Sequence, residues 1–312
     1  MRGLLASSAI LFATTGLLVA CGDNGASTGE LIAFASDQDG DWDVYLLDPT
    51  ARIARRVINN GATDLAPDLS HDGLRIVYSS NYLDGKMRDY IDRSGESPRR
   101  IIGEVLGDSD IFSIDSDGQN LERLTSTAAI DEQPTWSPDG SQIAFQSDMS
   151  GDIEIHVMGA DGGNLRQLTT SPGDDWSPTW SPDGERIAFA SSRNGNWDIF
   201  TMNADGSRVE QITSDPGMDW LPAWSPSGET IAFASDRDGN WEIYVVDTDG
   251  SGSRNITDNQ ATDLEPVWSP DGDKLIFSSS RDGSQELFTV HLDGSDPERL
   301  GQSGLPFSWV RP

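Results

Sequence analysis

The sequence repeats a unit of 44 residues. The start of the unit, Pro-x-Trp-Ser, recurs at equal spacing, at Pro134, Pro178, Pro222 and Pro266. A period of about 20 to 50 residues indicates that each copy is one supersecondary unit that cannot bury its apolar face alone. Such a chain can fold only by packing each copy against the next, either as an open array or as a closed ring.

One copy, residues 178–221, contains four short apolar segments separated by turn sequences. Pro182-Asp183-Gly184 and Asp205-Gly206 are typical turns, and Asn194-Gly195 is the dipeptide that most favours a two-residue hairpin. The expected strands are 179–181, 187–191, 198–203 and 209–213. The unit is therefore predicted to be a four-stranded antiparallel meander with its more polar fourth strand at the outer edge.

Repeats of about 40 to 45 residues with four strands each are typical of β-propeller blades. Allowing for one longer copy, the length from residue 30 to residue 312 corresponds to six blades. The first copy, from Glu30, lacks the Pro-x-Trp-Ser strand, and residues 305–310 look like that missing strand. We therefore predict an all-β, six-bladed β-propeller over residues 30–312, with its first blade closed by the C-terminal strand.

An uncharged, mostly apolar run extends from residue 3 to residue 20 and is followed by Cys21. This pattern predicts a secretory signal peptide over residues 1–20. The sequence LVAC at its end resembles the lipobox of bacterial lipoproteins, which implies lipidation of Cys21. A signal anchor is the alternative for the run, and an inert buried residue is the alternative for this single cysteine.

Residues 21–29 are small and polar, and they are predicted to form a flexible tether. The expected location is therefore extracytoplasmic and membrane-anchored, on the periplasmic side of the outer membrane if the cell is Gram-negative. We expect the protein to act as a monomer.

The composition is strongly acidic, with 52 Asp and Glu residues against 21 Lys and Arg residues and a formal net charge of −31. Such a charge repels phosphate backbones and anionic headgroups. Nucleic acid is therefore excluded as a partner class, and membrane contact is expected only through the lipid anchor. Much of the acid lies in turn sequences, so a solvated acidic exterior accounts for most of it.

The second copy, from Pro67, carries an insertion at about residues 81–108, between its second and third strands. Five basic residues form a cluster within it, Lys86, Arg88, Arg93, Arg99 and Arg100. Loops longer than about 15 residues are usually functional or disordered. Arg99 and Arg100 are therefore candidate binding residues, with a passive insertion as the alternative.

An aspartate lies three residues before the first-strand proline in five copies, at Asp64, Asp131, Asp175, Asp219 and Asp263. In a meander, the loop before the first strand and the turn between the second and third strands lie at the same end of the ring, so this end is the predicted binding face. One interpretation is that the carboxylates converge on the channel mouth, where a divalent cation or a basic partner group supplies the counter-charge. The other is that each carboxylate caps its own turn.

Tryptophans recur in two sets. Those of the first strand are predicted to be packing residues, Trp136, Trp180, Trp224 and Trp268. The second set stands before the third strand or before the first strand, Trp42, Trp197, Trp241, Trp176 and Trp220. These either pack between blades or contribute to a contact surface, and Trp176 and Trp220 are candidate binding residues.

The sequence contains no recognisable catalytic constellation. His71, His156 and His291 are dispersed, without the spacing of metal ligands, and no glycine-rich phosphate loop is found. We therefore predict no catalytic residue and no resident metal or cofactor, apart from the cation considered for the channel mouth.

The repeat P-x-W-S-P-D-G-x-x-I-A-F-x-S resembles the TolB-type, WD-like β-propeller repeat over residues 30–312. TolB is a periplasmic protein of the Tol-Pal envelope system, and its propeller binds a peptidoglycan-associated lipoprotein. This resemblance and the absence of a catalytic set imply a non-enzymatic scaffold that binds a protein or glycan at the cell envelope, and the lipobox, which TolB lacks, implies that it is lipid-anchored. The alternative is a metal-assisted propeller lyase or hydrolase with its site at the central channel.

Overall fold

The computed structural model describes residues 29–82 and 109–312. The predicted signal peptide, the lipidation site Cys21, the tether up to residue 28 and the insertion residues Arg99 and Arg100 lie outside the described residues. The described chain forms strands only, and it contains no helix that is long and apolar enough to cross a membrane.

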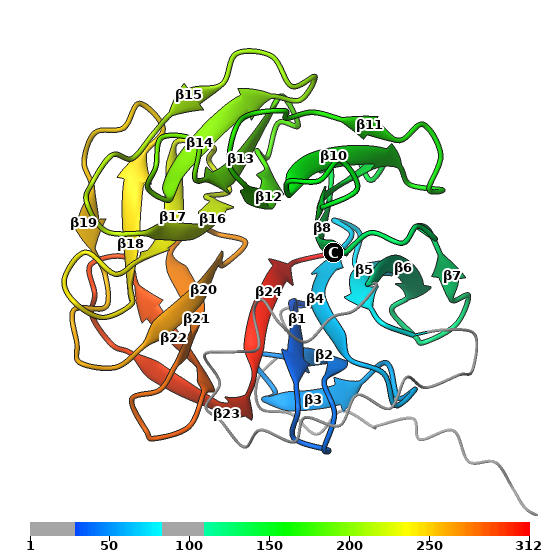
Figure 1. Ribbon diagram of the computed structural model, residues 1–312. Helices are drawn as coiled ribbons and strands as arrows, with labels where there is room; N and C mark the ends of the chain where they lie inside the picture. The colour runs from blue at the N-terminus through cyan, green and yellow to red at the C-terminus, as the bar shows by residue number, and fades with distance from the viewer. Residues whose placement is uncertain (1–28, 83–108) are drawn as a thin grey trace, which may run out of the picture.

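Six four-stranded antiparallel sheets surround a central channel as the blades of a propeller (Figure 1). This confirms the predicted fold class. The strands of each blade run from the channel outward in sequence order, except that the innermost strand of blade 1 comes from the C-terminus (Figure 1).

The strand boundaries repeat closely from blade to blade. Blade 1 consists of β24 (Leu305–Val310), β1 (Leu31–Ser36), β2 (Asp43–Asp48) and β3 (Ile53–Arg56). Blade 2 consists of β4 (Asp64–Leu69), β5 (Arg75–Ser80), β6 (Asp110–Asp115) and β7 (Glu122–Arg123). Blade 3 consists of β8 (Asp131–Trp136), β9 (Gln142–Ser147), β10 (Glu154–Gly159) and β11 (Arg166–Gln167).

Blade 4 consists of β12 (Asp175–Trp180), β13 (Arg186–Ser191), β14 (Asp198–Asn203) and β15 (Glu210–Gln211). Blade 5 consists of β16 (Asp219–Trp224), β17 (Thr230–Ser235), β18 (Glu242–Asp247) and β19 (Arg254–Asn255). Blade 6 consists of β20 (Asp263–Trp268), β21 (Lys274–Ser279), β22 (Glu286–His291) and β23 (Glu298–Ser303).

The core lies between neighbouring blades. The second and third strands are buried on both faces because each blade is covered on both sides, so their sequences are continuous apolar runs rather than alternating ones. Between blades 4 and 5, for example, Ile199 packs with Trp224, Phe233 and Tyr244 in one cluster. Trp224 and its three counterparts are only 5–7% exposed, which confirms their predicted packing role.

The first strands begin earlier than predicted, at the aspartate. In blade 4 the strand starts at Asp175 rather than at Thr179, because a β-bulge lies within it. The bulge residue, Ser177, has a left-handed backbone with φ of +51°. Its counterparts in the other blades are equally left-handed, Ala66, Gln133, Leu221 and Glu265. The fourth strand is shorter than predicted, covering Glu210–Gln211 rather than 209–213.

The C-terminal strand closes the ring. β24 pairs with β1 in antiparallel register, from Leu31 opposite Val310 to Ala35 opposite Leu305. The Ser308 hydroxyl accepts a hydrogen bond from the Leu69 backbone N–H of blade 2 at 2.9 Å, and Glu30 accepts one from the Trp309 indole at 3.1 Å. The prediction that both termini share one blade is therefore confirmed.

Candidate functional site

The five repeated aspartates are the first residues of the innermost strands, and each is 0% exposed. They do not stand in the loop before the strand, as the sequence analysis placed them, because the bulge extends the strand back to the aspartate. Each aspartate N–H donates to a carbonyl of the previous blade, for example Asp219 to Trp197 at 2.9 Å. Their side chains lie inside the junctions between blades, and a role in binding a ligand stays a prediction.

A second acid faces each aspartate across the junction, from the start of the third strand of the previous blade. The five acid pairs are Asp43 with Asp64, Asp110 with Asp131, Glu154 with Asp175, Asp198 with Asp219, and Glu242 with Asp263. Both members of each pair are buried. Two carboxylates that share a buried site repel each other, so each junction requires a counter-charge.

One arginine meets this requirement at each junction of the described ring, including the closing junction, where Ser303 replaces the aspartate. Blades 4, 5 and 6 supply it from the turn after the second strand, and blades 1, 2 and 6 supply it from the fourth strand. The arginine–acid pairs are Arg56–Asp43, Arg123–Asp110, Arg193–Asp175, Arg237–Asp219, Arg281–Asp263 and Arg299–Glu286. These ion pairs do not follow from the repeat pattern, because the arginine comes from different positions in different blades.

Burial and mutual repulsion still weaken the acidity of these groups. Burial raises the pKa of Asp64 to about 7, and burial with the nearby Asp41 charge raises the pKa of Asp43 to about 6. Burial and the Asp219 charge raise the pKa of Asp198 to about 6. Stability from these groups is present below their unfolded pKa values and falls as pH rises through the folded values. These acid pairs therefore make the junctions less stable as pH rises, and the paired arginines offset part of that loss.

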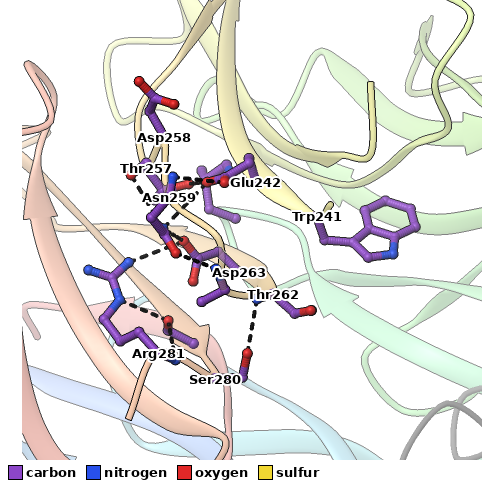
Figure 2. A network of polar contacts seen from close by, with 12 residues as sticks. Trp241, Glu242, Thr257, Asp258, Asn259, Thr262, Asp263, Ser280 and Arg281 are labelled. Carbon is purple, nitrogen blue, oxygen red and sulfur yellow. Dashed lines mark hydrogen bonds and ion pairs between the residues drawn. The ribbon is translucent and has the colours of Figure 1, made fainter. Parts of the chain in front are cut away.

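The junction between blades 5 and 6 shows the arrangement in detail (Figure 2). Arg281 donates to Asp263 at 3.1 Å, and Asn259 donates to the same carboxylate at 2.6 Å. The Asn259 backbone N–H donates to Glu242 at 2.9 Å. Trp241 points away from this network (Figure 2). The polar contacts therefore hold the backbone from which the indole projects.

Four tryptophans come together at this end of the propeller, Trp176, Trp197, Trp220 and Trp241. Trp220 lies at the centre, stacked on Trp176 at 5.9 Å and on Trp241 at 5.5 Å between ring centroids, and Trp197 meets it edge-on at 5.5 Å. All four side chains are partly exposed. We call this end of the ring the tryptophan face, and the end with the Ser-Pro-Asp-Gly turns the turn face.

Two members of this cluster, Trp176 and Trp220, are the candidate binding residues predicted from the sequence. Trp197 and Trp241 join them because the start of the third strand lies beside the first strand of the next blade. At the position of Trp176 and Trp220, blades 2, 3 and 6 carry Leu65, Glu132 and Leu264. The four contacting indoles therefore belong to blades 4 and 5, whereas blade 1 carries a single partly exposed Trp42 at the position of Trp197 and Trp241, so the fold itself does not require the cluster.

The central channel contains a cavity with a volume of about 520 Å³. The innermost strands line it, with the bulge residues toward the tryptophan face and the Ser-Pro turns at the other end. Two acidic residues, Asp68 and Glu265, are part of its wall. Among residues 29–82 and 109–312, no three His, Cys, Asp or Glu side chains gather in a way that would hold a metal ion.

Comparison with known proteins identifies the propeller. Residues 169–251 and 207–308 match the TolB beta propeller domain family, and residues 105–196 match the Tricorn protease N-terminal beta propeller domain. Residues 169–308 carry TolB-type β-propeller repeats. A TolB homolog from Chlorobium chlorochromatii is 32% identical over 139 residues, which cover 38% of this chain and 31% of that relative. The match thus spans about a third of the relative's length.

Solved structures show the same fold. The TolB-type propeller superposes on a putative TolB from Agrobacterium tumefaciens with a TM-score of 0.69 at 24% identity, covering 89% of this chain and 91% of that chain. It superposes on TolB from Acinetobacter baumannii with a TM-score of 0.73 at 19% identity, covering 91% of this chain and 67% of that chain. At these identities the likeness concerns the fold.

Proposed function

We propose that this chain is a lipid-anchored extracytoplasmic scaffold that binds a protein partner at the cell envelope through its tryptophan face. The observation that carries the proposal is the cluster of Trp176, Trp197, Trp220 and Trp241. Large aromatic side chains that stay partly exposed in a monomeric protein are typical anchors of protein interfaces. The matches to TolB homologs support the same class of function.

The packing of the indoles favours a protein partner over a glycan. Trp220 stacks on Trp176 and on Trp241 with interplanar angles of 19° and 28°, so the rings cover part of one another's faces. A sugar ring requires a free indole face on which to stack. A contiguous surface of four partly exposed indoles instead suits apolar side chains of a partner. Because the chain carries a net charge of −31, we expect basic groups around the partner's apolar anchor.

Affinity capture from membranes with tagged protein tests this function. Trp176→Leu and Trp220→Leu place the residue of blades 2 and 6 at these positions, so the fold is kept while the aromatic surface is lost. Loss of one interface hot spot costs about 2 kcal/mol or more, so we expect the double variant to recover at least about 30-fold less partner. Charge reversal at Asp183 and Asp271 on the turn face is the matched control and leaves recovery unchanged. Equal recovery with both variants contradicts the proposal.

The lipid anchor has its own test. If Cys21 is acylated, Cys21→Ser moves the protein from the membrane fraction to the soluble fraction and abolishes the mass increase of the acyl chains. Membrane fractionation and mass spectrometry of the two proteins measure this. An unchanged distribution and mass rule out lipidation at this residue.

A further inference from the structure

Glu265 is a buried carboxyl that the fold does not need. It is the bulge residue of β20, is 8% exposed and lines the central channel. At the equivalent position blades 2 to 5 carry Ala66, Gln133, Ser177 and Leu221, with φ values between +50° and +56° against +55° for Glu265. Neutral residues therefore satisfy the same backbone geometry, and the repeats serve as internal controls for what the fold requires at this position.

No partner within the described chain compensates for the Glu265 carboxyl. No hydrogen bond or ion pair to it is formed by residues 29–82 or 109–312, and burial alone raises its pKa to about 8. Asp68, the other channel carboxyl, differs: it accepts hydrogen bonds from the Trp136 N–H at 2.7 Å and from the Thr135 hydroxyl at 3.1 Å. The Glu265 oxygens open onto the channel, where a cation can reach them, and a cation there would offset the cost of burying the charged carboxylate.

The chemistry of the channel wall defines that ligand. No lysine or arginine lines the channel, and His71 at the turn face is its one basic residue. Apart from the two acids the wall is mixed: a proline from every innermost strand, Val267 and Phe307 lie beside neutral polar side chains such as Gln133 and Thr179. Calcium prefers six to eight oxygen ligands, whereas one carboxylate beside apolar side chains and neutral acceptor groups matches one ammonium group on an alkyl chain.

We propose that the central channel binds a small alkylammonium ion, with the Glu265 carboxylate as its counter-charge. Gln133 and Ser177 lie in the same ring of bulge residues and carry further acceptor oxygens. The site lies inside the ring, whereas the proposed protein interface lies on its surface. A test of the ammonium site is therefore independent of a test of the protein interface.

Titration calorimetry of the full-length protein with n-butylammonium tests the site. We expect Glu265→Gln to weaken binding at least about tenfold, the equivalent of one charge-assisted hydrogen bond. Glu229→Gln, at an exposed turn, is the matched control and leaves the affinity unchanged. Neutral n-butanol, which has the same shape, binds no more tightly to the wild-type protein than to Glu265→Gln.

Nα-acetyl-lysinamide distinguishes two sources of the ammonium group. Weaker binding than that of n-butylammonium indicates a free amine, and tighter binding indicates a lysine side chain.

Protonation supplies an independent readout. Because the pKa of Glu265 is about 8 in the free protein, binding at pH 6.5 forces it to ionise and releases about one proton. Affinity therefore rises between pH 6 and pH 8 and then levels while the amine stays charged. Asp68, whose pKa is raised by burial to about 6, and His71 are the other titratable groups of the channel wall, so Asp68→Asn is titrated in parallel and keeps the proton release.

The melting temperature of Glu265→Gln shows whether this variant folds. The raised pKa means that ionised Glu265 destabilises the fold as pH rises through about 8, so Glu265→Gln melts at or above the wild-type temperature at pH 9. A loss of binding in that variant then reflects the lost charge. Equal affinity of both proteins for n-butylammonium, no binding by the wild-type protein, or competition by Ca²⁺ that depends on Glu265 each overturn the proposal.

Discussion

Removal of residues 303–312 is expected to abolish cooperative folding. The deletion takes away β24, which pairs with five residues of β1 and packs against β20 and β4 on either side. It exposes the edge of β1, opens the channel and separates blade 1 from blade 6. The loss should exceed the whole stability of a typical domain, about 5–15 kcal/mol, so we expect aggregation and no melting transition.

Two controls isolate ring closure in this prediction. Deletion of Arg311 and Pro312 alone removes the partly exposed ion pairs of Arg311 with Glu30 and Asp271 and leaves β24 in place, so it should lower the melting temperature by a few degrees at most. A circular permutant that places residues 303–312 before Glu30 through a short linker should restore a cooperative transition, because Val310 lies opposite Leu31. A truncated protein that melts like the wild type contradicts the closed ring.

Arg237→Met is expected to cost about 3–5 kcal/mol, which for a domain of this size lowers the melting temperature by about 6 to 20 °C. The guanidinium donates to Asp219 at 3.0 Å, pairs with Asp215 at 2.7 Å and lies 4.4 Å from the centroid of the Tyr244 ring. Its loss leaves Asp219 and Asp198 buried together without a cation. Thermal unfolding monitored by circular dichroism measures the change.

The pH dependence of the stability lost in Arg237→Met distinguishes the lost charge from the lost packing. The pKa values of Asp198 and Asp219 are raised by burial, so both acids gain protons on acidification, and the deficit of Arg237→Met should be smaller at pH 5 than at pH 8. Arg208→Met is the control, because Arg208 pairs with Glu210 at 3.1 Å on the exposed outer edge and should change stability by less than about 0.5 kcal/mol. An equal deficit at both pH values contradicts the electrostatic explanation.

The fold was predictable from the sequence because it follows from local patterns that repeat. Turn sequences such as Asn194-Gly195 and Asp205-Gly206 separate the strands, and the 44-residue period sets the blade count. The closing strand was also predictable, since residues 305–310 resemble the strand missing before Glu30. Each of these inferences needed only residues within one copy or a comparison between copies.

The contents of the junctions were not predictable in this way, because they depend on contacts between copies. Asp175 looks like a loop residue until the bulge at Ser177 is known, and a left-handed serine has no sequence signature. Trp197 and Trp220 meet only because blades 4 and 5 are neighbours in the ring. One signal was present in the sequence: an arginine follows the last serine of the second strand by two residues in three copies, at Arg193, Arg237 and Arg281.

Photocrosslinking in cells tests the central claim, that the tryptophan face carries recognition, most directly. Replacing Trp241 by p-benzoylphenylalanine keeps an aromatic group at the exposed end of the cluster, and the same replacement at Ser227 places the probe on the turn face. We predict a crosslinked partner protein from position 241 and none from position 227 after irradiation. A partner captured from position 227 and absent from position 241 contradicts the account.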